Sequence, residues 1–226
     1  SFMWDGAINH IEVQALAPIN HPKEMGESTE NVVTKLQRSP KYPALFETAF
    51  GSATITGEHL LKALAQFQLT FISANSKYDR AKAGTEKFSE QEENGYKLFI
   101  KNCASCHTEP LFTNGNFENN GLLIDSTLND FGRVIISQNP ADSLKFKVPT
   151  LRNIEFSYQY MHDGRYKTLS EVLKFYTAGN FNHLANSPQL KGISLSTNEQ
   201  VDIIAFLLTL TDKEFLFNPD FAFPQK

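Results

Sequence analysis

The sequence predicts a mostly α-helical protein, and three observations carry this prediction. Apolar side chains recur at helical spacing, most clearly over residues 60–71. At the start of three expected helices, a Ser or Thr stands three positions before a Glu, which is the spacing of a capping box in the first turn of a helix. No convincing strand ladder, internal repeat or low-complexity tract interrupts this pattern.

The first half of the chain contains two expected helices. The first begins near Ser28 and ends before Pro40, because proline cannot continue a helix. The second begins at the N-cap residue Thr56 and ends around residues 74–76. Its expected buried face consists of Leu60, Leu61, Leu64, Phe67 and Phe71.

A domain boundary is expected after these helices. Residues 77–87 are rich in charged side chains and include Gly84, so they resemble a linker. We therefore predict an N-terminal helical domain over residues 1–85 and a C-terminal helical domain over residues 86–226.

The second half contains three further expected helices, each opened by a capping box. The capping pairs are Ser89 with Glu92, Thr168 with Glu171, and Ser196 with Glu199. Residues 108–152 are rich in Asn, Gly, Asp and Pro, and a loop of this length inside a domain is usually functional. The last helix is expected to bury Val201, Ile204, Ala205 and Leu208.

Composition excludes several classes of protein. The chain has 226 residues, with 21 basic and 25 acidic side chains, and it lacks the basic stretch that a nucleic-acid surface needs. No apolar run approaches the roughly 20 residues that span a bilayer, so no transmembrane segment is expected. Two cysteines are too few for a disulfide framework.

Both cysteines belong to one motif, Cys103-Ala104-Ser105-Cys106-His107. This is the attachment pattern of a c-type haem. Two thiols at this spacing can form thioethers with the two vinyl groups of one porphyrin, and the adjacent imidazole becomes the proximal iron ligand. The motif therefore predicts one covalent haem c.

Three other interpretations of the motif compete with haem attachment. A thioredoxin-like dithiol follows a strand, whereas here a helix is expected before the motif. A structural zinc site needs two further ligands at short spacing, and the sequence offers none nearby. A chance match is the third interpretation.

A cytochrome c iron usually has a sixth ligand, and Met, His and Tyr can all serve. Residues 158–165 offer Met161 and His162, and the helix that follows offers Tyr176. Met161 could instead fill the core, and His162 could order its own loop. From the residues alone, Met161 is the first choice.

Longer stretches of the chain also match the sequence motifs of a known protein family, in the same order along the chain. In the C-terminal half they are residues 146–153, 160–165 and 168–172, and in the N-terminal half they are residues 2–6, 14–19, 24–26, 42–46 and 75–80. Together they resemble the bacterial di-haem cytochrome c peroxidase and MauG family over nearly the whole chain. The resemblance implies a cytochrome c-like C-terminal domain and the remainder of a peroxidatic N-terminal domain.

The family resemblance implies a periplasmic enzyme with one haem c in each domain. One haem reacts with hydrogen peroxide, and the C-terminal haem takes in electrons from a small cytochrome or cupredoxin. The residues Cys103, Cys106 and His107 match the C-terminal attachment site, and Arg152 lies in a matching motif that implies a role in cofactor binding.

Four residues of the first half match the peroxidatic side of the family site. Trp4 matches a tryptophan that lies between the two haems. Gln14, Pro18 and Glu24 match residues of the distal pocket, where the glutamate acts as acid and base. Such a carboxylate needs a pKa raised by burial, whereas the residue types alone favour a solvated loop carboxylate.

The sixth ligand of the C-terminal haem divides the family. Peroxidases place a methionine on the short helix after the His-Asp-Gly turn, and MauG-like members place a tyrosine there. The matching position holds Tyr176, which moves Tyr176 ahead of Met161. The family also implies a calcium ion, held partly by the backbone carbonyls of Ser157 and Gln159.

The chain departs from the family pattern in one respect. The segment with the first Cys-x-x-Cys-His is absent from the 226 residues, so one covalent haem is expected here and a second upstream. Residues 1–6 resemble neither a signal peptide nor a natural start, which also indicates a longer protein. The expected activity is peroxide reduction, and the alternatives are MauG-like oxidation of a partner protein or electron transfer by a one-haem cytochrome. A homodimer is compatible with the resemblance.

Overall fold

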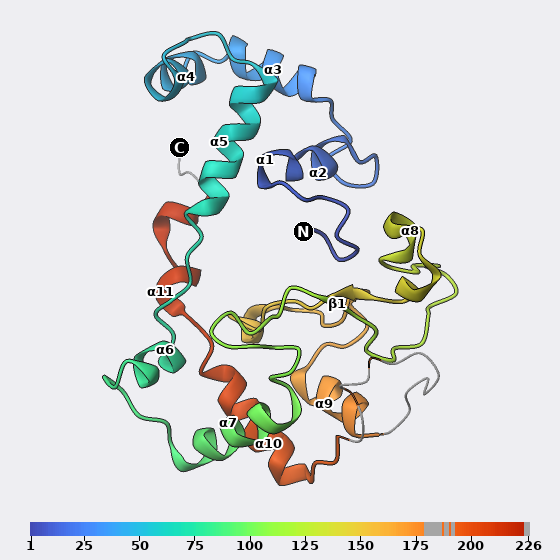
Figure 1. Ribbon diagram of the computed structural model, residues 1–226. Helices are drawn as coiled ribbons and strands as arrows, with labels where there is room; N and C mark the ends of the chain where they lie inside the picture. Colours follow the sequence, from blue (N-terminus) through green and yellow to red (C-terminus); the bar gives the residue numbers. More distant parts are fainter. Residues whose placement is uncertain (179–186, 188–189, 191–192, 224–226) are drawn as a thin grey trace. The chain divides into compact units, whose positions relative to one another are not determined.

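The computed structural model describes residues 1–178, 187, 190 and 193–223 (Figure 1). The predicted mostly helical fold is confirmed. The chain forms two compact units. The N-terminal unit comprises residues 1–3 and 7–72, and the C-terminal unit comprises residues 4–6 and 73–226.

The N-terminal unit is built from short helices. They are α1 (Ile11–Gln14), α2 (Leu16–Asn20), α3 (Thr29–Arg38), α4 (Tyr42–Phe50) and α5 (Gly57–Leu69). The expected helix starts at Ser28 and Thr56 are confirmed, because each side chain accepts a hydrogen bond from the backbone N–H three residues later. The core contains Ala15, Ile19, Phe46, Ile55, Leu60 and Ala65.

The expected end of the second helix was wrong. Helix α5 ends at Leu69, so Phe71 lies beyond it. The rings of Phe67 and Phe71 contact each other edge to face at 4.8 Å, and both side chains are exposed rather than buried.

The C-terminal unit contains longer helices and one small sheet. Its helices are α6 (Lys77–Lys82), α7 (Glu90–Asn102), α8 (Val134–Ser137), α9 (Leu169–Thr177), α10 (Thr197–Leu208) and α11 (Lys213–Leu216). The capping boxes that open α7, α9 and α10 are all confirmed. Strands β1 (Phe117–Glu118) and β2 (Phe146–Lys147) pair antiparallel within the expected long loop.

Residues 77–82 form a helix, although the sequence suggested a linker there. Ser76 and Asp79 form a fourth capping box at the start of α6. Tyr78 is buried against Phe99, Phe112 and Phe206 of the C-terminal unit. The compact units therefore divide after residue 72, while the domain boundary between residues 85 and 86 stays a prediction.

The core of the C-terminal unit forms where α7 and α10 pack together (Figure 1). Gly95 of α7 lies against the backbone of α10, where a Cβ atom would stand only 1.9 Å from the carbonyl oxygen of Asp202. The fully buried side chains around this crossing are Phe99, Phe112, Ile203, Phe206 and Leu210.

The expected buried face of α10 was wrong at its two ends. Val201 and Leu208 are exposed, and Ile203, Phe206 and Leu207 form the buried face instead, followed by the buried Leu210 just beyond the helix. Both sets have the same helical spacing, so the sequence pattern fits either face. In the structure the face next to Gly95 is the one that packs.

Among the described residues, no helix is long and apolar enough to cross a bilayer.

Candidate functional site

The C-terminal unit contains a large cavity that is partly open to solvent. Its walls come from the end of α7, the β1–β2 sheet, the turn at residues 160–162, and helices α9 and α10. Most of the lining side chains are apolar, and few polar groups interrupt them. A cavity of this kind suits a large, flat, apolar ligand.

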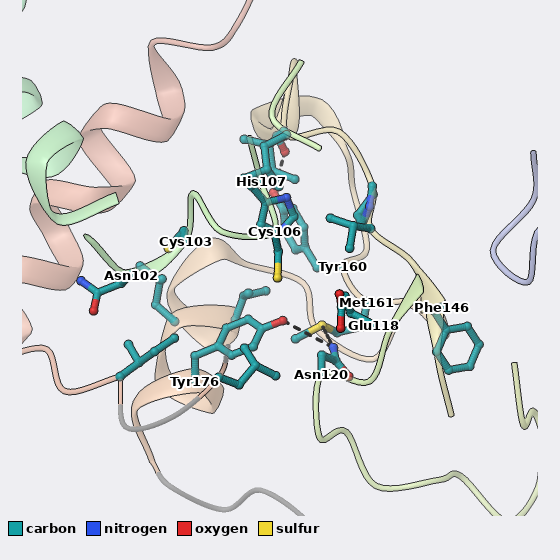
Figure 2. A pocket seen from close by; sticks show the side chains of 18 of the residues that line it. Asn102, Cys103, Cys106, His107, Glu118, Asn120, Phe146, Tyr160, Met161 and Tyr176 are labelled. Atoms are coloured by element: carbon teal, nitrogen blue, oxygen red, sulfur yellow. Dashed lines mark hydrogen bonds between the residues drawn. The ribbon is translucent and has the colours of Figure 1, made fainter. Parts of the chain in front are cut away.

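The Cys-x-x-Cys-His motif forms a tight turn at the end of α7. Cys103 is the C-cap residue of α7, and its carbonyl accepts hydrogen bonds from the backbone N–H groups of Cys106 at 3.2 Å and of His107 at 2.9 Å. This turn brings both thiols and the imidazole to the wall of one cavity. Figure 2 shows these side chains together with Tyr176 and Met161.

The two thiols lie in surroundings that disfavour a thiolate. Desolvation by the surrounding protein raises the pKa of Cys103 to about 12, and the nearby Cys106 adds to the rise. Desolvation also raises the pKa of Cys106. Dithiol oxidoreductases lower the pKa of their reactive cysteine instead, so these surroundings do not fit a redox dithiol.

The imidazole of His107 is arranged as a neutral metal ligand. Its Nδ1 donates a hydrogen bond to the carbonyl of Phe112 at 3.0 Å, which leaves the lone pair on Nε2. Desolvation lowers the pKa of His107, although the carbonyls of Phe112 and Pro149 oppose this shift. Two thiols, a neutral imidazole and an apolar cavity form a donor set that fits a haem c.

Tyr176 and Met161 line the same cavity. The side-chain amide of Asn120 donates to the hydroxyl of Tyr176 at 3.4 Å and contacts the sulfur of Met161 at 3.5 Å. Desolvation raises the pKa of Tyr176 to about 12, although the hydrogen bond from Asn120 opposes the rise. Figure 2 shows the Tyr176 hydroxyl and the Met161 sulfur beside this amide. Tyr176 and Met161 are therefore both placed to contact a haem bound in this cavity.

The third candidate, His162, also lines the cavity but is engaged elsewhere. Its ring stacks on Phe146 with ring centres 3.6 Å apart and planes at 12°. The adjacent Asp163 pairs with Arg165, whose guanidinium also donates to the carbonyl of Leu123 at 2.9 Å. These contacts fit the interpretation that His162 orders its own loop.

Trp4 is the one residue of the first ten that lines the cavity. Its carbonyl accepts a hydrogen bond from the backbone N–H of Lys147 in β2 at 2.7 Å. Trp4 is 43% exposed, so it lies at the rim of the cavity rather than in the core.

Arg152 lies outside the cavity lining. Its guanidinium binds the two carboxylate oxygens of Asp79 at 2.9 and 2.8 Å, and its Nε donates to the carbonyl of Pro110 at 3.0 Å. Arg152 therefore links α6 to the segment that follows the Cys-x-x-Cys-His motif. Its expected role in cofactor binding stays a prediction.

The expected distal residues lie in the N-terminal unit. Gln14 ends α1, where its side-chain carbonyl accepts from the amide of Gln68 at 3.1 Å. Pro18 is partly buried in α2. Glu24 is exposed in the turn that follows, 3.8 Å from the Nδ1 of His21. The structure therefore does not show the burial that an acid–base role for Glu24 would need.

The expected calcium-binding carbonyls belong to an exposed turn. Ser157 ends a short 3₁₀ helix (Ile154–Phe156), and Gln159 has a positive φ of 77°. The two residues lie two positions apart in this turn, and their role as calcium ligands stays a prediction.

Sequence reasoning missed Asn120 and Glu118, which also line the cavity. Both lie at or just after β1, inside a stretch rich in Asn and Gly where polar residues are typical of any loop. Neither residue type nor spacing distinguishes them from their neighbours.

Comparison with known proteins agrees with this geometry. The profile of the family described as di-haem cytochrome c peroxidase matches residues 1–87, and the cytochrome c profile matches residues 92–211. The methylamine utilization protein MauG of Methylorubrum extorquens is 36% identical over 93% of the chain. The cytochrome c551 peroxidase of Nitrosomonas europaea is 34% identical over 98% of the chain.

A solved structure shares the fold as well. The crystal structure of a MauG-like protein associated with microbial copper homeostasis superposes with a TM-score of 0.84 at 27% identity, covering 97% of this chain and 75% of that one. The chain spans 60% of the length of the Methylorubrum protein and 63% of the Nitrosomonas protein. The chain belongs to the di-haem cytochrome c peroxidase and MauG family.

Proposed function

We propose that the protein reduces hydrogen peroxide to water with electrons from a small redox protein, and that the C-terminal cavity holds the haem through which electrons enter. The observation that carries this proposal is the convergence of Cys103, Cys106 and His107 on one apolar cavity. When bound there, a haem c supplies an iron that accepts and passes on single electrons.

The residues of the cavity have separate tasks in this proposal. Cys103 and Cys106 attach the porphyrin through thioethers, and the Nε2 of His107 binds the iron. The hydrogen bond from Nδ1 to the Phe112 carbonyl fixes the ring orientation and keeps the imidazole neutral. The apolar walls exclude water, which strengthens every electrostatic interaction inside.

We assign the sixth ligand to Tyr176 ahead of Met161. Tyr176 is held by α9, a capped helix whose Leu173 is buried in the core, whereas Met161 lies in a turn with a positive φ of 71°. A phenolate oxygen stabilises ferric iron, while a thioether raises the reduction potential. Asn120 supports either ligand by pointing its amide at both.

The chemistry at peroxide belongs to the N-terminal unit in this proposal. Glu24 takes this role on its match to the family glutamate, although its carboxylate is exposed in this unit. It moves a proton from the near to the far oxygen of peroxide, with Gln14 and Pro18 completing the pocket. Two electrons and two protons then give two water molecules. Trp4, at the rim of the C-terminal cavity, carries electrons toward that pocket.

Two further features follow from the family and belong to the same proposal. The protein acts in the bacterial periplasm, where haem c attachment takes place and small cytochromes or cupredoxins are available as donors. A calcium ion is held partly by the carbonyls of Ser157 and Gln159, in a turn that is exposed to solvent.

The proposal is tested with the full-length, haem-loaded protein and a reduced donor cytochrome. Peroxide should oxidise the donor, and Glu24→Gln should slow this reaction by about 10²–10⁴-fold, the usual contribution of a positioned acid or base. Glu12→Gln is the matched control, because Glu12 is an exposed carboxylate on α1. If peroxide did not oxidise the donor, the proposal would fail, and electron transfer by a cytochrome without peroxidase activity would remain as the function.

A second candidate is MauG-like oxidation of residues in a partner protein. The observation that favours it is the position of Tyr176 in the cavity, since MauG-like members place a tyrosine there. A haem spectrum typical of tyrosine ligation, with slow turnover of donor cytochrome, would favour this second candidate over the first.

A further inference from the structure

The C-terminal unit holds a short piece of the N-terminus, residues 4–6, against its small sheet. The backbone N–H of Lys147 in β2 donates a hydrogen bond to the Trp4 carbonyl at 2.7 Å. Lys147 pairs in register with Phe117 across the β1–β2 ladder. The backbone of Trp4 is therefore fixed to the edge of a strand whose two residues both line the cavity.

Arg133 binds the next two residues of this segment. Its Nη1 donates to the carbonyl of Asp5 at 2.9 Å and to the carbonyl of Gly6 at 3.0 Å. Its guanidinium also lies over the ring of Phe117, 4.5 Å from the ring centre. A planar guanidinium can donate along its edge while its face rests on an aromatic ring, and lysine cannot do both.

Gly6 makes the close approach of this segment possible. Its φ is +70°, and a Cβ atom on it would lie 2.2 Å from Cζ of Phe117 and 2.8 Å from Nη1 of Arg133. A larger residue would be strained at this φ and would require the Phe117 ring, the Arg133 guanidinium or the segment itself to move. The backbone, the guanidinium and the ring thus form one closely packed contact.

Arg133 itself is fixed by its own loop. Its backbone N–H donates to the carbonyl of Lys145 at 2.8 Å. The preceding Gly132 has a φ of +65° and approaches the same carbonyl so closely that a Cβ atom would stand 2.4 Å from it. The guanidinium therefore starts from a rigid base next to β2.

We propose that Arg133 is a positioning residue that holds Trp4 at the rim of the haem cavity by binding the carbonyls of Asp5 and Gly6. The inference rests on the proposed function in one respect, since it takes the cavity to hold haem. It does not depend on peroxide turnover. Without the guanidinium, residues 4–6 keep the hydrogen bond from Lys147 to the Trp4 carbonyl. They lose both charge-assisted hydrogen bonds, which are those to the carbonyls of Asp5 and Gly6.

The test compares Arg133→Gln and Arg133→Lys with the parent protein, all loaded with haem. Hydrogen exchange of the peptide covering residues 1–9 should become about tenfold faster or more in Arg133→Gln, because two hydrogen bonds to a charged donor are lost. Arg133→Lys keeps one charged donor, so the exchange rate of residues 1–9 in this variant should lie between the rates in the parent protein and in Arg133→Gln. Exchange as slow as in the parent protein would overturn the proposal.

A second measurement follows the indole directly. Trp4 is the single tryptophan of the 226 residues, and the Trp4→Phe variant supplies the background signal from any other part of a longer protein. Haem shortens the fluorescence lifetime of a nearby indole by energy transfer, so the Trp4 lifetime should lengthen several-fold in Arg133→Gln. An unchanged lifetime would contradict the proposal even if exchange became faster.

The matched control is Lys145→Gln, which removes a positive charge from the same loop. The Lys145 side chain pairs with Asp142 at 3.0 Å, and the backbone carbonyl that accepts from the Arg133 N–H is kept in this variant. Exchange of residues 1–9 and the Trp4 lifetime should stay at the parent values, and a change equal to that in Arg133→Gln would overturn the proposal.

A second variant protects the test against misfolding. Gly6→Ala disturbs the same contact from the other side, and we expect the same two changes with an unaltered haem absorption spectrum. If both variants lost haem, the proposal would be contradicted, because the contact would then support the whole cavity. If the parent protein showed no peroxide turnover while exchange and lifetime still changed in both variants, the proposed function would fail and the role of Arg133 would stand.

Discussion

Replacement of Gly95 by Ala tests the packing on which the cavity depends. The new Cβ would stand 1.9 Å from the carbonyl oxygen of Asp202, about 1.5 Å short of the 3.4 Å at which ordinary contact begins. The carbonyl belongs to the backbone of α10 and cannot rotate aside, so α10 must move as a whole. That movement would loosen the contacts between Phe99 and Phe206, which now lie with ring centres 5.1 Å apart.

The size of the effect follows from two opposing contributions. Alanine is favoured over glycine inside a helix by about 1 kcal/mol. Overpacking a core costs about 1–3 kcal/mol, and here we expect the upper end because the obstacle is backbone. We therefore expect Gly95→Ala to lower the free energy of unfolding by about 2 kcal/mol, and the melting temperature by about 4–8 °C.

The assay is urea unfolding of the haem-loaded protein, followed by haem absorbance. Gly57→Ala is the matched control, because Gly57 is also helical and its Cβ would make an ordinary contact at 3.5 Å. The control should change stability by a few tenths of a kcal/mol at most. A Gly95→Ala protein as stable as its parent, or more stable, would refute the tight crossing of α7 and α10.

Three further predictions concern the site and its supports. Tyr176→Phe should shift the haem spectrum toward high spin and raise the reduction potential. Met161→Leu should leave the spectrum unchanged and lower the free energy of unfolding by less than about 1.5 kcal/mol. The opposite pattern would assign the sixth ligand to Met161. Cys103→Ala should abolish cooperative melting of the C-terminal unit, because haem fills its centre, and native-like melting would contradict this. Desolvation raises the pKa of Asp79, but its hydrogen bonds with Arg152 and Ser76 and the Arg152 charge outweigh this and hold the pKa below 3.8. Its stabilising effect is therefore present above pH 3.8 and is lost as the pH falls through the lower folded value. Asp79→Asn should cost about 3 kcal/mol at neutral pH and flatten the acid limb of the stability profile in urea titrations, and an unchanged acid limb would contradict the pairing.

Helix starts were the most predictable part of the fold, because a capping box is a local interaction. In all three predicted boxes, the Ser or Thr side chain and the Glu three residues later satisfy each other's backbone N–H groups. The same logic also applied at Ser76 and Asp79, but the charged residues around them suggested a linker. Tyr78 supplies the buried anchor that keeps this short helix folded.

Burial was less predictable, because it depends on the partner that each helix meets. Helix α10 has two apolar stripes with equal spacing, and the stripe containing Ile203 and Phe206 is buried because Gly95 allows α7 to approach it. Glu24 illustrates the same limit, since its expected burial needs neighbours that local sequence does not specify. The structure leaves it exposed.

The site was predictable where chemistry dictates spacing and unpredictable where contacts are distant in sequence. The thiols and imidazole of residues 103–107 face one cavity, as the motif requires. Asn120 reaches Tyr176 across 56 positions, and Arg133 reaches Asp5 across 128. No local pattern marks either residue, because each acts through a contact that only the folded chain creates.

The most direct test of the account is the intact mass of the chain after expression with a c-type cytochrome maturation system. We expect the polypeptide to carry one covalent haem, and we expect this haem to be lost when Cys103 and Cys106 are both replaced by Ala. An unmodified mass from a competent host would contradict the account, because the cavity could then not serve as the electron-entry site.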